Sequence, residues 1–243
     1  MPETRPYYDE GRITIYHGDC RDVMPALPAG SVDCVVTDPP YGVSFVRRRD
    51  RNRRRIAGDN DTSLLLPAFR EIYRVLKPDT LSVSFYAWPH ADQFLSAWRE
   101  AGFRVVSHLV FLKNVWGLGY YTRGQHETAS LLARGNPPLP ARVISDTIPW
   151  EREKDAWHPT QKPVAAIAAL LAAFAPEGGL VLDPFMGSGT TLRAAKDLGC
   201  RAIGIEVEAD YCARAAGRMA QGVLFPAAVA GGGKERGLFD TSS

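Results

Sequence analysis

Short apolar stretches rich in β-branched residues alternate along the chain with longer stretches in which apolar residues recur every three or four positions. The short stretches predict strands at 13–16, 32–37, 81–86, 105–111, 128–133, 180–182 and 202–206. The longer ones predict helices at about 64–76, 91–101, 164–174, 190–198 and 209–220, and a short helix that Asp19 caps and that ends near Leu27. Strands that alternate with helices predict a doubly wound α/β fold with one mostly parallel sheet.

Three stretches interrupt this alternation. The stretch 42–60 is long and rich in arginine, 116–125 is rich in glycine and aromatic residues, and 135–149 is rich in proline and expected to lack regular structure. Long irregular segments inside a compact domain are usually functional or disordered. We expect one folded domain over 1–230, with an arginine-rich loop at 43–60 and a small insertion at about 134–157, followed by a flexible tail at 231–243.

Composition fits a soluble globular protein, because 45% of the 243 residues are hydrophobic and 23% are charged. The net charge of +2 says little about partners, but 46–56 alone carries seven arginines and one aspartate. No C-x-x-C pair occurs among the four cysteines, which argues against a disulfide framework and a zinc site and favours a reducing cytoplasm. The chain has no apolar stretch of membrane-spanning length, and its first residues do not form a signal peptide.

The segment 180–191 joins a predicted strand to a predicted helix through the glycines Gly187 and Gly189. Glycines there let the backbone approach a ligand, and Glu206, at the end of the next strand, can accept both hydroxyl groups of a ribose. A tight turn with a surface glutamate is the simpler alternative. Asp183 ends the first strand where a dinucleotide site would begin with glycine. Its carboxylate suits a cationic amine and would repel a pyrophosphate.

A second motif, Asp38-Pro39-Pro40-Tyr41, directly follows the predicted buried strand 32–37. Consecutive prolines fix the backbone, so the Asp38 carboxylate and the Pro39 carbonyl become two rigidly held acceptors beside the flat ring of Tyr41. Two acceptors that bind both N–H groups of an aromatic amine favour a pyramidal nitrogen, whose lone pair can attack a methyl group. The alternative is a strand-ending turn with an incidental tyrosine.

Taken together, Thr37-Asp-Pro-Pro-Tyr-Gly42, His158-Pro-Thr-Gln-Lys-Pro163 and Asp183-Pro-Phe-Met-Gly-Ser-Gly-Thr-Thr191 resemble the motifs of the DNA amino-methyltransferases. The catalytic motif precedes the cofactor motif, as in the permuted group called β. The resemblance covers about 13–219 and implies a Rossmann-like, S-adenosylmethionine-dependent methyltransferase domain that modifies double-stranded DNA. It makes the insertion at about 134–157 a target-recognition segment.

The resemblance also implies a role for each motif residue. The base would be held by the catalytic residues Asp38, Pro39, Pro40 and Tyr41. The cofactor would be bound by Asp19, Cys20, Asp38, Thr160, Lys162, Asp183, Phe185, Gly187, Ser188, Gly189, Thr190, Thr191 and Glu206. Two of these have plainer interpretations, because Asp19 is also a helix cap and Lys162 could be a solvated charge before Pro163.

DNA contacts are expected from the arginine-rich loop and from an aromatic loop. The arginines Arg47, Arg48, Arg49, Arg51, Arg53, Arg54 and Arg55 follow the catalytic motif and would bind phosphates, although charged stretches are often merely solvated. Tyr120 and Tyr121 would contact DNA around a base flipped out of the duplex. Trp88 and Trp116 could do the same, and packing within the domain is the alternative for all four aromatic residues.

Adenine N6 is the favoured target, because relatives that act on cytosine N4 more often carry serine at the position of Asp38. A protein or RNA methyltransferase, or a DNA-binding subunit without catalysis, are further alternatives. Whether tritiated methyl groups are transferred to DNA, to RNA or to protein distinguishes a DNA methyltransferase from the first two alternatives. The effect of Asp38→Ala on methylation tests the third. We expect no metal site, a cytoplasmic location, a homodimer by analogy with similar enzymes, and a separate cognate restriction endonuclease as an optional partner.

Overall fold

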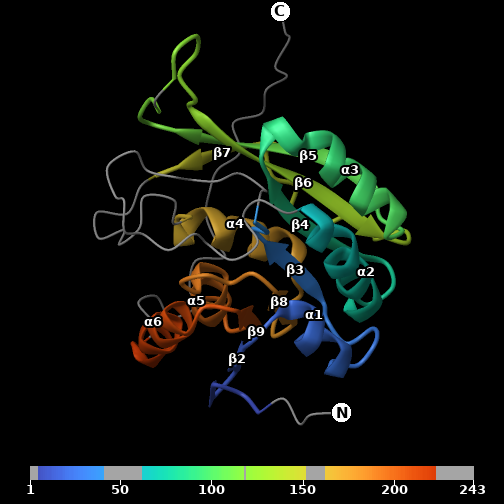
Figure 1. Ribbon diagram of the computed structural model, residues 1–243, viewed down its shortest axis with the longest axis vertical. Coiled ribbons are helices and arrows are strands. Elements are labelled where there is room, and N and C mark those ends of the chain that lie inside the picture. Colours follow the sequence, from blue (N-terminus) through green and yellow to red (C-terminus); the bar gives the residue numbers. More distant parts are fainter. Residues whose placement is uncertain (1–4, 41–61, 118, 152–161, 223–243) are drawn as a thin grey trace, which may run out of the picture.

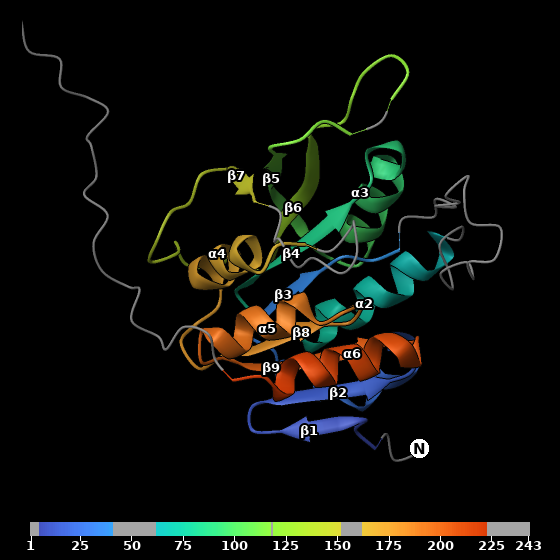
Figure 2. The same ribbon diagram turned by 90° about the vertical axis from the view of Figure 1, so that its left-hand side faces the viewer.

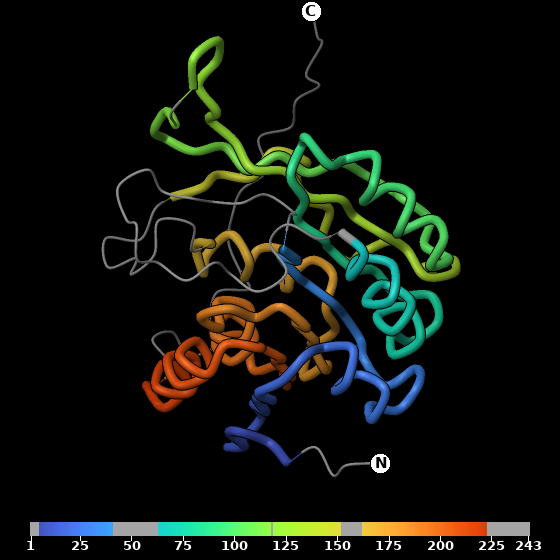
Figure 3. The backbone as a smooth tube through the Cα atoms, viewed as in Figure 1, coloured from blue at the N-terminus to red at the C-terminus, as the bar shows by residue number. Residues whose placement is uncertain are grey.

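One sheet with helices on both faces forms the described part of the protein (Figure 1). The structure is a computed structural model, and it describes residues 5–40, 62–117, 119–151 and 162–222. The tube in Figure 3 follows the chain from the β-strands near the N-terminus, across the sheet, and back again to its starting side. This return brings the segments before and after the middle of the sequence together in one sheet.

The sheet has nine strands in the order β1-β2-β9-β8-β3-β4-β6-β5-β7. Their bounds are β1 (Tyr8–Glu10), β2 (Ile13–His17), β3 (Cys34–Thr37), β4 (Thr80–Tyr86), β5 (Arg104–Lys113), β6 (His126–Arg134), β7 (Thr147–Trp150), β8 (Leu180–Asp183) and β9 (Arg201–Glu206). β1 pairs antiparallel with β2, and β6 pairs antiparallel with both β4 and β5. The remaining pairs are parallel, so every strand of this sheet except β1 and β6 runs in one direction.

Helices divide between the two faces and form two cores. One face carries α1 (Cys20–Val23), α2 (Leu65–Val75) and α3 (Ala91–Glu100), and the other carries α4 (Val164–Phe174), α5 (Thr190–Asp197) and α6 (Ala209–Ala220). Short 3₁₀ helices cover Met24–Ala26, Thr62–Leu64 and Trp88–His90. Phe69 and Trp98 are buried in the first core, and Phe85 and Leu170 in the second. Each such side chain contributes about 1.5–3 kcal/mol through burial.

The carboxyl ends of the parallel strands meet at one side of the sheet, which we call the carboxyl edge. From β8 the chain continues to β9 on one side, whereas from β3 it continues to β4 on the other. β8 and β3 therefore flank a topological switch point, the place where open α/β sheets bind ligands. The doubly wound fold expected from the sequence is confirmed.

Two short strands escape the sequence prediction. β1 has the polar sequence Tyr8-Asp-Glu10 and pairs only with β2, so no apolar run marks it. β7 begins within the proline-rich stretch 135–149 and ends one residue beyond it. The prediction that this stretch lacks regular structure is therefore wrong for 147–149. β7 pairs only with β5, at the border of the sheet, and borders tolerate a proline such as Pro149.

A long hairpin connects β5 to β6 and projects beyond the rest of the described chain (Figure 2). Both strands are longer than the sequence predicted, since they extend to Lys113 and begin at His126. Because Tyr86 of β4 pairs with Thr128 of β6, the hairpin leaves the sheet at the carboxyl edge. The pairing register of β4 with β6 thus brings the β5–β6 hairpin to the side of the sheet where β3 and β8 end.

Candidate functional site

The glycine turn between β8 and α5 is built by two glycines in the left-handed region. Gly187 has φ 51° and Gly189, the N-cap of α5, has φ 79°. A Cβ at Gly189 would lie 2.9 Å from the Cβ of Ala215, so glycine is needed there for α5 to pack on α6. A Cβ at Gly187 would meet nothing within 4 Å. The space beside Gly187 is therefore open to a ligand.

Glu206 ends β9 and lies next to this turn. Its carboxylate accepts hydrogen bonds from the backbone N–H groups of Gly187, at 3.0 Å, and of Glu208, at 2.9 Å. Burial raises the pKa of Glu206 above its ordinary value, although these N–H donors oppose the shift. The side chain of Glu206 is thus partly buried and hydrogen-bonded to the turn.

Asp183 ends β8 and is buried at the switch point. Thr37 donates its hydroxyl hydrogen bond to Asp183 Oδ1 at 3.0 Å, and the backbone N–H of Phe185 donates to the same oxygen at 3.2 Å. Burial raises the pKa of Asp183 to about 7, despite these hydrogen bonds, and the negative charge of Asp38 adds to the rise. The carboxyl group therefore changes its charge near neutral pH.

Asp38 follows β3 directly, so it lies one residue beyond the Thr37 that binds Asp183. Pro39 is buried and Pro40 partly buried, which fixes the backbone on the far side of Asp38. This arrangement confirms that Asp38 and the glycine turn meet at neighbouring strand ends.

Lys162 forms an ion pair with Asp38, with 2.5 Å between Nζ and Oδ2. The lysine side chain is only 10% exposed and that of Asp38 34%. The Lys162 ammonium group also lies 4.7 Å from the centre of the Phe85 ring and 5.7 Å from that of Trp150. Cation–π contacts of a desolvated ammonium stabilise by about 2 kcal/mol. The interpretation of Lys162 as a solvated charge is wrong.

The segment that follows β2 also lies at the carboxyl edge, beside the end of β9. The N–H of Gly18 donates to the backbone carbonyl of Glu206 at 2.9 Å, which ties this segment to β9. Asp19 caps α1 by accepting from the N–H of Arg21 at 2.8 Å, and Arg21 lowers the pKa of Asp19. Cys20 is buried, and burial raises the pKa of its thiol to about 12. The predicted helix cap at Asp19 is confirmed.

Large aromatic side chains are exposed on the hairpin and beside it. Tyr120 is 96% exposed, Tyr121 102% and Trp88 78%, so packing within the domain does not explain them. Trp116 is also exposed, and the Arg123 guanidinium lies 5.9 Å from the centre of its ring. Trp88 follows β4, whose end lies at the carboxyl edge. These aromatic groups border the side of the molecule that carries Asp38.

The remaining residues predicted to bind the cofactor lie at the turn. Phe185 and Ser188 are partly exposed, while Thr190 and Thr191 are buried in the first turn of α5. Thr190 accepts a hydrogen bond from Arg218 at 3.2 Å, and Thr191 Oγ1 lies 3.5 Å from the carbonyl oxygen of Val36. Thr191 thereby links α5 to β3, the strand that Asp38 directly follows.

Several predicted residues lie outside the described part of the chain. They are Tyr41, Thr160 and the arginines Arg47, Arg48, Arg49, Arg51, Arg53, Arg54 and Arg55. The loop 43–60 and the tail 231–243 lie outside it as well. Their predicted roles stay predictions.

Sequence reasoning missed the residues that surround Lys162. Phe85 belongs to the apolar pattern of β4 and Trp150 to a short strand beside a proline-rich stretch, so neither carries a local signal of function. Lys113 also lies over the Trp150 ring, at 5.1 Å, and forms an ion pair with Glu127.

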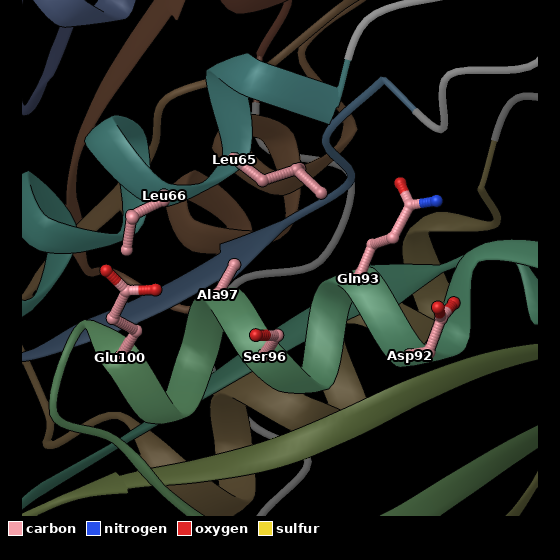
Figure 4. A pocket seen from close by; sticks show the side chains of 7 residues that line it. All are labelled: Leu65, Leu66, Asp92, Gln93, Ser96, Ala97 and Glu100. Carbon is pink, nitrogen blue, oxygen red and sulfur yellow. The ribbon is translucent and has the colours of Figure 1, made fainter.

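A shallow depression lies between α2 and α3, away from these residues. It is lined by Leu65, Leu66, Asp92, Gln93, Ser96, Ala97 and Glu100 (Figure 4). The lining comes from helix surfaces and includes none of the predicted site residues. It does not belong to the site at the carboxyl edge.

Two kinds of site are absent from the described residues. Among them, no group of three or more His, Cys, Asp or Glu side chains is arranged to hold a metal ion. Within the same ranges, no helix has the length and apolar character needed to cross a membrane. All four cysteines are buried and none forms a disulfide, as the sequence predicted.

Known proteins are similar to this chain in fold and in sequence. The solved PvuII DNA methyltransferase, described as cytosine-N4-specific, has a TM-score of 0.75 at 17% identity, with 90% of each chain covered. The M1.HpyAVI–SAM complex has a TM-score of 0.68 at 22% identity, covering 86% of this chain and 100% of that one. YubD of Escherichia coli (strain K12) is 47% identical over 194 residues, which are 80% of this chain and 84% of YubD. The family model described as DNA methylase, of the N6/N4 type, matches residues 32–217. Most of the chain is thus matched, and it belongs to the N6/N4 DNA methylase family.

Proposed function

We propose that this DNA methyltransferase transfers a methyl group from S-adenosylmethionine to the exocyclic amino group of a flipped base, and that the base is adenine, modified at N6. The observation that carries the proposal is the meeting of two motifs at the switch point. Asp38-Pro39-Pro40 follows β3, and the glycine turn follows Asp183, the last residue of the neighbouring β8. The solved M1.HpyAVI structure, which has the same fold and contains SAM, supports this cofactor.

The residues at the carboxyl edge fit S-adenosylmethionine. Open space beside Gly187 would accommodate the ligand next to the backbone, and the partly buried Glu206 would accept hydrogen bonds from its ribose. Asp183, when ionised, would attract the cationic amino group, because opposite charges interact strongly at a buried site. Phe185, partly exposed at the same turn, offers an apolar face.

When bound, S-adenosylmethionine supplies a sulfonium methyl group, and transfer breaks the C–S bond, leaves its electron pair on sulfur and forms a bond from carbon to the amine nitrogen. Asp38 would accept a hydrogen bond from one N–H of the target amine, and the Pro39 carbonyl from the other. These contacts hold the nitrogen in line with the methyl group and disperse the positive charge that develops on it. The proton that the nitrogen loses passes through its hydrogen bond to Asp38 and then to water.

Double-stranded DNA would approach the carboxyl edge, where the hairpin and Trp88 project. A base within a duplex cannot reach Asp38, so it must rotate out, and exposed aromatic rings can stack on it or fill the gap it leaves. Tyr120 and Tyr121 at the hairpin are suitably exposed. The seven arginines of 47–55 would bind the phosphates, which is a prediction from the sequence alone.

Cytosine N4 is the second candidate target, since the structurally similar PvuII enzyme is cytosine-specific. The aspartate at position 38 favours adenine, because cytosine-specific relatives more often carry serine there. Digestion of methylated DNA to nucleosides, followed by mass spectrometry, tests the choice. N6-methyladenosine is the expected product, and N4-methylcytidine would replace our proposal by the second candidate.

Location and partners belong to the same proposal. Four reduced, buried cysteines fit a reducing cytoplasm, where the DNA substrate is found. A homodimer and a separate cognate restriction endonuclease are further predictions. Sedimentation of the purified protein tests the first, and the genes that flank its own test the second.

A further inference from the structure

The ion pair between Lys162 and Asp38 joins two distant segments at the reacting group. Asp38 follows β3 directly, whereas Lys162 lies just before Pro163, the N-cap of α4. The two residues are 124 positions apart in the sequence. Pro163 is buried and has a fixed φ of −65°, so the backbone from which Lys162 extends is well fixed.

Aromatic rings restrict where the ammonium group of Lys162 can lie. Phe85 lies in β4, the strand that pairs with β3, and the centre of its ring is 4.7 Å from Lys162 Nζ. Trp150 belongs to β7, and the centre of its ring is 5.7 Å from the same Nζ atom. A lysine side chain normally has great rotational freedom, and these contacts, together with the ion pair, remove most of it. The ammonium group thus becomes a fixed point against which Asp38 is held.

A carboxylate held in this way keeps its ability to accept further hydrogen bonds. Each ionised carboxylate has two oxygens and about four acceptor positions. Lys162 binds Oδ2. Contact with this oxygen therefore sets the orientation of the whole group without preventing it from binding the N–H of a target amine.

We propose that Lys162 is a positioning residue, which orients the Asp38 carboxylate toward the amine during methyl transfer. This inference rests on the proposed function and assigns Lys162 a different role from the cofactor contact that its motif implies. Lys162 acts through Asp38, so its loss lowers the rate of the chemical step. The same loss of Lys162 leaves the affinity for S-adenosylmethionine nearly unchanged.

The test measures two quantities on Lys162→Met. One is the Kd for S-adenosylmethionine, by isothermal titration calorimetry, and the other is the single-turnover rate of methyl transfer to duplex DNA at saturating cofactor. We expect the rate to fall about 10- to 100-fold, as for a misplaced catalytic group, and the Kd to change less than about twofold. A weaker Kd with an unchanged saturated rate would overturn the proposal in favour of a cofactor contact.

Lys113→Met is the matched control. Lys113 also lies over the Trp150 ring and is also paired with a carboxylate, but that carboxylate belongs to Glu127. Its loss removes similar packing without touching Asp38, so the single-turnover rate should stay within about twofold of the unmodified protein. An equal fall in both variants would show that packing around Trp150 matters and that orientation of Asp38 does not.

A double-mutant cycle with Asp38→Asn isolates the pair. Without the charge at position 38, Lys162→Met should reduce the remaining rate by less than about threefold, because the two residues act as one unit. A full additive loss contradicts the proposal. Lys162→Gln, which keeps a polar chain, replaces Lys162→Met if melting curves show that the latter is unfolded. If the unmodified protein methylates no DNA, the proposed function fails first; if it does and Lys162→Met matches it, only the positioning role fails.

Discussion

The two sides of the carboxyl edge hold their carboxylates in different ways. On the proposed cofactor side, Asp183 and Glu206 accept hydrogen bonds from backbone N–H groups of the glycine turn and the end of β9, and Asp183 accepts one more from the Thr37 hydroxyl. On the target side, a side chain from a distant segment holds Asp38, because Lys162 reaches it from the start of α4. Apart from Thr37, the first side is contained in 180–208, whereas the second draws on β3, β4, β7 and the residue before Pro163, the N-cap of α4.

The difference indicates how each side responds to substitution. A carboxylate that the backbone holds is in place whenever the strand, turn and helix form, so changes there affect folding and cofactor binding together. A carboxylate that a side chain holds depends on the packing of several elements, and a single substitution can alter it while the fold persists. We expect the target side to control the rate and the cofactor side to control affinity and stability.

The largest expected effect is on the target side. Asp38→Ala removes the acceptor for the developing positive charge, and the methylation rate at saturating cofactor should fall about 10²- to 10³-fold. Affinity for S-adenosylmethionine should change by less than about fivefold, because the lost contact matters mainly in the transition state. Transfer of tritiated methyl groups to duplex DNA, with calorimetry alongside, measures both. Intact methylation would undermine Asp38 as the catalytic acceptor.

A pair of glycine substitutions sharpens the cofactor side. Gly189→Ala combines a positive φ with a Cβ 2.9 Å from that of Ala215, so it should lower the free energy of unfolding by about 2–4 kcal/mol. Gly187→Ala meets open space and should cost only about 1–2 kcal/mol of stability, but its methyl group would occupy the space proposed for the cofactor.

Chemical denaturation and cofactor titration of both variants check this contrast. Gly187→Ala should show the larger loss of affinity for S-adenosylmethionine, and Gly189→Ala the larger loss of stability. Equal affinity losses, corrected for the fraction that is folded, would mean that the space beside Gly187 is not the cofactor site.

The protonation of Asp183 gives the cofactor side a pH dependence. Burial raises its pKa to about 7, so the carboxylate that would attract the cationic amine is lost as the pH falls through that value. Between pH 7.5 and 5.5, affinity for S-adenosylmethionine should drop more than about tenfold, since the amino group of the cofactor stays cationic there. Asp183→Asn is the control, because it should bind weakly with a flatter pH profile.

Stability of the free protein should follow the opposite trend. The folded-state pKa of Asp183 lies above its ordinary value of 3.8, so its contribution to stability is fully present below about pH 3.8 and is lost as the pH rises to about 7. Melting curves with and without cofactor at several pH values separate the two trends. A cofactor affinity that is constant from pH 5.5 to 7.5 would argue against contact with Asp183.

The smallest effect is expected at the hairpin. Tyr120 and Tyr121 are almost completely exposed, so replacing both by alanine should change the free energy of unfolding by less than about 0.5 kcal/mol. Affinity for duplex DNA should fall about 5- to 10-fold, since stacking on a base contributes about 1–3 kcal/mol. Fluorescence anisotropy with labelled DNA measures this, and unchanged affinity would remove the two tyrosines from the DNA interface.

The same contrast explains what the sequence could predict. Gly187, Glu206 and Asp183 carry local signals, because a strand, a glycine turn and a second strand follow one another within about 30 residues, and the structure brings them together. The end of β3 at Asp38 was also predictable, since prolines stop a buried strand. The partners of Lys162 were not, because Phe85 and Trp150 approach it only through the order and register of the sheet. β1 is polar and largely exposed, and β7 has only two buried residues, separated by a proline, so neither forms an apolar run that the sequence could reveal.

The pairing of β5 with β6 has a consequence for how such proteins diversify. Adding two residues to each strand would advance the hairpin tip by about 7 Å and keep every side chain on its original face. The change would leave β3, β8 and the reacting carboxylate where they are. If the hairpin contacts DNA as proposed, its reach can therefore evolve in increments of strand length, independently of the residues proposed to carry out methyl transfer.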